Sequence, residues 1–190
     1  FQKQEIEFNG KIVLIRVDFN VPLEQSDDSY YISDHTRINE SIPTIKNVIN
    51  KNPKLIILVS HLGRPKGKHV NSLSLFPIKN YLSLKLNKKI SFLTQYYPLT
   101  DLSKFSGIVM LENIRFLNEE EKFSPNNNLS QYLSKNIDIY INEAFSCSHR
   151  SHTSIVGINS DNKLAGYLLM KEVNKLSPIL SNKIKKTLII

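Results

Sequence analysis

Four short apolar runs, each followed at once by a cluster of polar side chains, constrain what this chain can fold into. The runs cover residues 11–17, 55–59, 108–111 and 137–141. Near-continuous apolar runs of this length are typical of strands buried on both faces of a parallel sheet. Ligands of such sheets bind beyond the carboxyl ends of the strands. The four polar clusters are therefore expected to converge on one site.

The polar clusters differ in composition but share side chains that bind anions or form hydrogen bonds. They read Asp18-Phe19-Asn20 after the first run, Ser60-His61-Leu62-Gly63-Arg64-Pro65 after the second, Glu112-Asn113-Ile114-Arg115-Phe116 after the third, and Asn142-Glu143-Ala144-Phe145 with His149-Arg150 after the fourth. Three of the four clusters contain an arginine, which favours an anionic ligand.

Arginine usage supports the same interpretation. The 25 basic residues comprise 20 lysines and only five arginines, which are Arg16, Arg37, Arg64, Arg115 and Arg150. The planar guanidinium grips phosphate or carboxylate with two donors at once, which an ammonium cannot do. One such arginine would be explained by a structural ion pair. Four of them, at strand ends and at the start of a predicted helix, favour an anion site.

Periodicity places further elements between the four runs. The first expected helix begins at Asp34 or Thr36, and later helices are expected over residues 74–86, 129–135 and 164–176. The other expected strands are 90–93 and 187–190, and a short hairpin is expected around 25–29. Strands that alternate with helices predict an α/β fold. The expected architecture is a three-layer α/β/α, Rossmann-like domain with a mostly parallel sheet.

Length and charge bound the remaining possibilities. The 190 residues fit one large domain or a marginal pair, and the residues from Lys185 onward resemble the opening of another buried strand. We therefore expect one domain over residues 1–185 and the start of a second at 186–190. The formal net charge of +8 permits a nucleic-acid partner, but the lysines are scattered without a long basic run, so none is expected. No apolar stretch is long enough to span a bilayer, and the single cysteine, Cys147, excludes an internal disulfide.

The polar clusters also resemble the sequence blocks of the phosphoglycerate kinase family. Arg16-Val17-Asp18-Phe19-Asn20-Val21-Pro22 is similar to the family signature, and the clusters at 60–65, 112–116 and 142–152 match three further blocks in family order and spacing. The family's Gly-Gly-Ala-Lys block, expected directly after Ile190, is absent. The resemblance thus covers the N-terminal, 3-phosphoglycerate-binding domain of a two-domain kinase.

The resemblance implies an activity and a set of roles. The family moves a phosphoryl group between 1,3-bisphosphoglycerate and MgADP, giving 3-phosphoglycerate and MgATP in glycolysis. Mg²⁺ and the nucleotide would be bound by the missing C-terminal domain, so no cofactor or metal ligand is expected in this chain. A cytoplasmic monomer that binds neither nucleic acid nor membrane is expected. The catalytic residue would be Arg37, and the substrate-binding residues would be Asp18, Phe19, Asn20, Arg37, His61, Leu62, Gly63, Arg64, Arg115 and Arg150.

Simpler interpretations remain for single residues and for the whole chain. Asp18 also fits a turn or cap, His61 a packed histidine, and Cys147 a core or lining thiol. His149 and His152 form a His-x-x-His pair that lacks further metal ligands. Ser146 stands where many family members have glycine, so the backbone there should not need positive φ. A binding module for phosphorylated metabolites would use the same arginines without catalysis.

Overall fold

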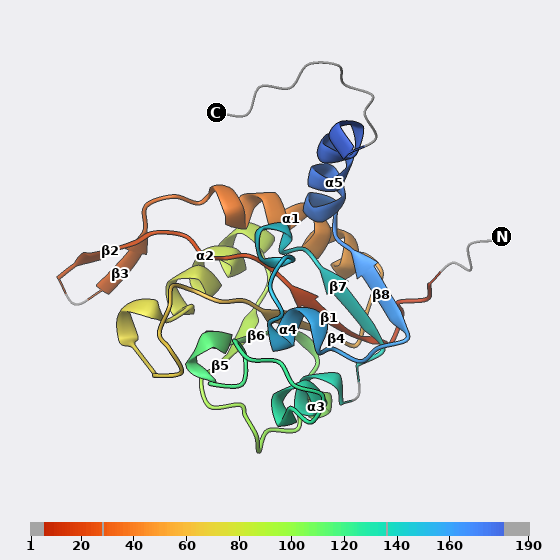
Figure 1. The fold of residues 1–190 in the computed structure, drawn as a ribbon. Helices are drawn as coiled ribbons and strands as arrows, with labels where there is room; N and C mark the ends of the chain where they lie inside the picture. The colour runs from red at the N-terminus through yellow and green to blue at the C-terminus, as the bar shows by residue number, and fades with distance from the viewer. Residues whose placement is uncertain (1–5, 28, 136, 181–190) are drawn as a thin grey trace.

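The protein contains a six-stranded parallel sheet between two helical layers. The computed structural model describes residues 6–27, 29–135 and 137–180. The strand order is β5-β6-β4-β1-β7-β8, and every neighbouring pair in this sheet is parallel (Figure 1). The predicted three-layer α/β architecture is therefore confirmed.

The elements follow the predicted order closely. The strands are β1 Ile12–Arg16, β2 Leu23–Ser26, β3 Ser29–Ile32, β4 Leu55–Val59, β5 Ile90–Leu93, β6 Gly107–Leu111, β7 Ile139–Asn142 and β8 Asn162–Ala165. The α-helices are α1 Thr36–Ile49, α2 Phe76–Leu86, α3 Asn128–Ser134, α4 Thr153–Val156 and α5 Tyr167–Leu180. Short 3₁₀ turns lie at η1 Asn71–Leu73, η2 Leu102–Lys104, η3 Ile114–Phe116 and η4 Phe145–Cys147.

Alternation along each strand divides the apolar side chains between two cores. Val13 and Ile15 of β1 pack on the side of α1 and α2, whereas Ile12 and Leu14 pack on the side of α3. All five residues of β1 are buried, as are all five of β4. The continuous apolar runs therefore arise because both faces of the central strands are covered.

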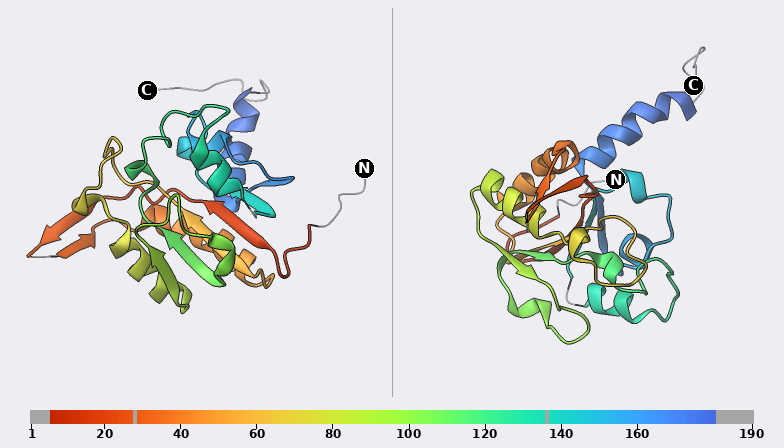
Figure 2. Two further views of the ribbon diagram at one scale, coloured as in Figure 1. Left: turned by 90° about the horizontal axis from the view of Figure 1, so that it is seen from below. Right: turned by 90° about the vertical axis from the view of Figure 1, so that its left-hand side faces the viewer.

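The β2–β3 hairpin and the last helix, α5, lie outside the six-stranded sheet. β2 and β3 form an antiparallel hairpin outside the main sheet, which confirms the predicted hairpin. The prediction of a helix over 164–176 was wrong at its start, because Leu164 lies in β8 and α5 begins at Tyr167. Beyond the edge strand, α5 projects away from the body of the domain (Figure 2).

Two expectations concern membranes and the chain end. Within the described ranges, no helix combines the length and apolarity required to cross a membrane. The strand predicted at 187–190 and the domain boundary at 185 lie outside the described residues.

Candidate anion-binding site

The sheet topology brings the four polar clusters to one edge. β1, β4, β6 and β7 carry the clusters and occupy adjacent positions in the sheet. The chain moves from β1 toward β4 and β6 on one side, then crosses to β7 and β8 on the other. The strand order therefore reverses beside β1, and ligands of open α/β sheets bind at such a switch point.

A cavity of about 250 Å³ lies at this edge and collects most of the predicted site residues. Its lining consists of Asn20, Arg37, His61, Gly63, Arg64, Arg115, Ser146, Cys147 and Arg150. The four arginines predicted for the site thus come together from four separate segments of the chain. Arg115 is almost fully buried, whereas the other three are exposed toward solvent.

Asp18 lies behind this cavity and organises two of its residues. The Asp18 carboxylate accepts short hydrogen bonds from a guanidinium nitrogen of Arg37 and from the Ser146 hydroxyl. It also accepts from the backbone N–H of Asn20 at 3.1 Å. Arg37 is the first-turn residue of α1 and its side chain is about half exposed (48%). The ion pair therefore ties the start of α1 to the end of β1 without burying Arg37.

The loop after β4 is shaped by hydrogen bonds from the clusters beside it. The Gly63 N–H donates to Asn20 Oδ1 at 2.9 Å, and the Gly63 carbonyl accepts from Arg115 Nη1 at 2.7 Å. Gly63 has φ of +60°, and a Cβ there would lie 2.7 Å from the Leu73 side chain. The positive φ therefore favours glycine, and a side chain there would require the end of the Leu73 side chain to shift.

Besides Asp18, two residues predicted to bind substrate, Phe19 and Leu62, do not line the cavity. Phe19 is fully buried in the core, and its N–H donates to Ser60 Oγ at 2.9 Å. Leu62 is also in the core, and both its backbone groups bond to the Asn113 side chain. Their neighbours in sequence face the cavity, so these two residues serve to anchor the polar loops.

His61 is buried at the inner wall of the cavity. Burial and then the nearby Arg16 cation lower the pKa of His61 to about 2. The imidazole is therefore neutral at physiological pH, and its approach to Asp18 Oδ1, at 4.0 Å, is a contact with a neutral ring. The side chain of Arg16 donates to His61 Nδ1 at 3.2 Å.

A buried polar network lies beneath the cavity on the α4 side. Arg16 Nε donates to Ser154 Oγ at 2.7 Å, and Ser154 donates from Oγ and N to the Glu120 carboxylate at 2.7 and 2.9 Å. Burial raises the pKa of Glu120, while Arg16 and the bonds from Ser154 oppose the rise. Burial lowers the pKa of His152, which lies 3.7 Å from Glu120, to about 4.

Cys147 and Ser146, the residue that stands where many family members have glycine, lie in η4 after β7. Among the described residues, Asp18, His61 and Cys147 each offer a ligand atom within 4.8 Å of the others. Arg37 and Ser146 already bond Asp18, however, and Arg16 bonds His61. The surrounding guanidiniums make this place more favourable for an anion than for a cation. Ser146 does not have positive φ, as its replacement of glycine predicted.

Sequence reasoning missed several participants in the site. Ser146, Arg16, Ser154 and Glu120 were not assigned roles, although each bonds to a predicted site residue or supports one that does. For Arg16 a signal existed, because an arginine inside a buried strand must find partners. The sequence gives no such signal for Ser154 or Glu120, which come from distant segments. His149 is exposed and does not line the cavity.

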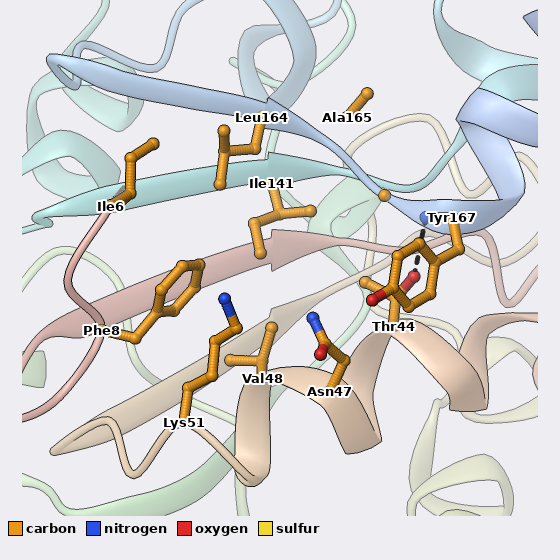
Figure 3. A pocket seen from close by; sticks show the side chains of 11 residues that line it. Ile6, Phe8, Thr44, Asn47, Val48, Lys51, Ile141, Leu164, Ala165 and Tyr167 are labelled. Carbon is orange, nitrogen blue, oxygen red and sulfur yellow. Dashed lines mark hydrogen bonds between the residues drawn. The ribbon is translucent and has the colours of Figure 1, made fainter. Parts of the chain in front are cut away.

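A larger cavity of about 580 Å³ lies between α1 and β8 and differs in character (Figure 3). Its walls are mainly apolar and include Phe8, Val48, Ile141 and Leu164. Among the described residues, the one charged side chain in its lining is Lys51, whose Nζ lies 4.6 Å from the centre of the Phe8 ring. This groove offers little to fix an anion, so the smaller cavity is the better functional candidate.

The chain is similar to known proteins along nearly its whole length. The chain is 43% identical over 192 aligned positions to the phosphoglycerate kinase of Wolinella succinogenes and 41% identical to that of Helicobacter hepaticus. Each alignment covers 98% of this chain but only 46% of the relative. The chain therefore spans slightly less than half the length of the curated relatives it matches.

Solved structures give the same result. The phosphoglycerate kinase of Coxiella burnetii superposes with a TM-score of 0.77 at 31% identity, covering 92% of this chain and 43% of that one. The enzyme of Pyrococcus horikoshii OT3 superposes with a TM-score of 0.79 at 28% identity, covering 97% and 46%. The family model for phosphoglycerate kinase matches residues 3–190. This chain belongs to the phosphoglycerate kinase family.

Proposed function

We propose that this chain is the glycerate-binding half of a phosphoglycerate kinase. The reaction would be reversible transfer of a phosphoryl group between the acyl phosphate of 1,3-bisphosphoglycerate and ADP, giving 3-phosphoglycerate and ATP. The observation that carries the proposal is the convergence of Arg37, Arg64, Arg115 and Arg150 on one small cavity. Four guanidinium groups, each able to donate two parallel hydrogen bonds, suit a substrate that carries a phosphate at one end and a carboxylate at the other.

The arginines divide into two roles in this proposal. Arg64, Arg115 and Arg150 would surround the 3-phosphate, which does not change during the reaction. Arg37 would face the carboxylate that becomes the acyl phosphate, where its charge offsets negative charge on the transferring group. Asp18 and the free amide group of Asn20 would hold the 2-hydroxyl as acceptor and donor. His61 would add one N–H donor.

The other half of the reaction would belong to a second domain. In the proposed organisation, residues 1–185 form the substrate domain, and residues from 186 onward begin the domain that binds the nucleotide with its Mg²⁺. When bound there, the metal ion neutralises phosphate charge; no residue of the present chain is assigned to it. The complete enzyme would be a cytoplasmic monomer.

Calorimetry and a coupled activity assay test the proposal together. The chain, or a complete enzyme that contains it, is titrated with 3-phosphoglycerate and with MgATP. We expect the chain to bind 3-phosphoglycerate and to bind MgATP hardly at all, and the complete enzyme to transfer phosphate in both directions. Tighter binding of MgATP by the chain would contradict the proposal. Binding of 3-phosphoglycerate without any transfer by the complete protein would instead identify a binding module.

A further inference from the structure

The inference concerns Arg16, which does not line the cavity but bonds a side chain that does. Arg16 is completely buried at the end of β1. Its guanidinium carries only donors and no acceptor. Because its Nη2 lies 3.2 Å from His61 Nδ1, the hydrogen bond between them requires a lone pair on Nδ1. A neutral imidazole with a lone pair on Nδ1 carries its proton on Nε2.

We propose that Arg16 is a positioning residue that fixes His61 as the neutral Nε2–H tautomer. His61 then presents an N–H donor to the anion cavity without carrying a charge. The other ring nitrogen, Nε2, is available to a ligand, because the Cys147 sulfur, at 3.8 Å, is the only polar atom of the described residues that lies within bonding range of it. That sulfur lies 3.9 Å from Nδ1 as well, so it is a weak partner for either nitrogen.

The groups around His61 favour the neutral ring over the imidazolium. Those that face it are Arg16 from β1, Asp18 after β1, Arg37 from α1, Arg115 from η3, Cys147 from η4 and His152 before α4. The cations among them repel a second positive charge, and burial adds to this effect. The one carboxylate, Asp18, is already bonded by Arg37 and by Ser146. Both bonds reach Oδ2, and Oδ1 lies 4.0 Å from His61 Nδ1, beyond hydrogen-bond distance, so no hydrogen bond from Asp18 stabilises an imidazolium.

The buried network prevents Arg16 from turning away from His61. Its Nε donates to Ser154 Oγ at 2.7 Å, and its Nη1 forms a short bond to the Val17 carbonyl. Nη2 lies 3.9 Å from Glu120 as well as near His61. A guanidinium held at three nitrogens has a fixed plane, so the direction of the bond to His61 is fixed too.

The consequence for binding rests on the proposed function. A phosphate or carboxylate that enters the cavity needs donors at fixed positions. An imidazole with Nδ1–H would turn a lone pair toward the anion and repel it. An exposed histidine would gain and lose its charge near neutral pH and would make binding pH dependent. A neutral donor held by Arg16 avoids both outcomes.

The tautomer itself is measured on the unmodified protein. The complete protein is labelled with ¹⁵N-histidine, and the ring nitrogens of His61 are observed through their coupling to the ring protons, with His61→Gln used for assignment. We expect Nε2 to be protonated and Nδ1 to be unprotonated, unchanged from pH 8 down to pH 5. This spectrum needs no substrate and no activity. It therefore remains decisive even if the proposed function is wrong.

Two substitutions separate positioning from stability. Arg16→Met removes the donor from His61, whereas Tyr140→Phe removes one buried hydrogen bond of the same network, the 2.9 Å bond from Tyr140 to the Ser154 carbonyl. Arg16→Met should release the tautomer and raise KM for 3-phosphoglycerate roughly tenfold, with kcat within about threefold. Tyr140→Phe should lower Tm while the His61 spectrum and KM stay as in the unmodified protein.

Specific results would overturn the proposal. A proton on Nδ1 in the unmodified protein, or titration of His61 near its ordinary pKa, excludes the fixed tautomer whether or not Arg16→Met folds. An unchanged His61 spectrum in folded Arg16→Met shows that Arg16 does not determine it. Equal increases in KM for Arg16→Met and Tyr140→Phe would show that general destabilisation, and not positioning, sets the affinity.

Discussion

Two cavities that α1 helps to line differ in size and in chemistry, and the difference favours one of them as the functional candidate. The apolar groove between α1 and β8 is about 580 Å³, more than twice the 250 Å³ of the arginine cavity. Apart from Lys51, the residues of the described ranges that line the groove are uncharged (Figure 3). The arginine cavity contains four guanidiniums and backs onto Asp18.

The physical reason lies in the position of each cavity relative to the sheet. The groove lies beside the edge strand β8, where the apolar side chains of the strand and of α1 leave a space between them. The arginine cavity lies beyond the carboxyl ends of four adjacent strands, where loops can direct polar side chains to one point. Close cations repel one another, so they are retained where an anion compensates for the repulsion. The comparison predicts strong effects at the arginine cavity and weak effects at the apolar groove.

The largest effect is expected at Arg37. In the complete enzyme, Arg37→Ala should lower kcat by roughly 10³ or more, because an arginine at a phosphoryl transition state contributes on that scale. Arg64→Ala should mainly raise KM for 3-phosphoglycerate, because its interaction is equal in ground and transition states. Steady-state kinetics of both variants checks this. A normal kcat in Arg37→Ala with only KM raised would remove the transition-state role from Arg37.

A smaller effect, on affinity for 3-phosphoglycerate, is expected at Arg115 in the arginine cavity, with Lys51 in the apolar groove as the control. Charged hydrogen bonds contribute roughly 1.5–3 kcal/mol each, so Arg115→Ala should weaken 3-phosphoglycerate binding by about 10- to 150-fold. Lys51→Ala removes the same charge from the apolar groove and should leave the affinity unchanged. Calorimetric titration of both variants measures the difference. Equal losses would mean that net charge, and not the cavity, controls binding.

The third prediction concerns pH and the buried histidines near the arginine cavity. The pKa of His152 is about 4 in the fold, against an ordinary value near 6.5 in the unfolded chain. Below pH 6.5 the unfolded chain gains a proton that the folded chain does not, so stability falls as pH falls toward 4. Between pH 7 and pH 5 this difference amounts to roughly 2 kcal/mol.

His152→Gln removes that loss and supplies the test. Denaturant unfolding of both proteins at pH 7 and pH 5 should show a smaller decrease for the variant. The raised pKa values of Glu120 and Glu143 make the folded state more stable as the pH falls, and they do so in both proteins alike. The comparison between the two proteins therefore isolates the contribution of His152. Identical decreases in the two proteins would mean that His152 titrates normally in the fold.

The smallest effect is expected for stability at the rim of the apolar groove. Lys51 is exposed, and its main contact in the groove is with the Phe8 ring. Surface substitutions usually change stability by no more than about 0.5 kcal/mol. Lys51→Ala should therefore leave the free energy of unfolding nearly unchanged, as measured by urea titration. A loss well above this would indicate that the Lys51 to Phe8 contact closes the groove.

The accuracy of the sequence predictions followed the degree of burial. β1 and β4 were predicted within a residue or two, because strands covered on both faces must be continuously apolar. β8 was missed because it is an edge strand, Asn162–Ala165, with alternating partial exposure and a single large apolar residue. Leu164 then appeared to begin the helix that actually starts at Tyr167. Weak burial leaves a weak pattern in the sequence.

The candidate site was predictable in membership but not in its internal contacts. The order of apolar runs and polar clusters determined the α/β class and the edge where the arginines meet, because side-chain hydrophobicity and strand direction are local properties. Whether Phe19 and Leu62 face the core or the cavity depended on which residue of each loop the packed helices cover. The bond from Arg16 to His61 joins residues 45 positions apart. Only the tertiary structure decided it, since the direction of a buried donor is set by every partner packed around it.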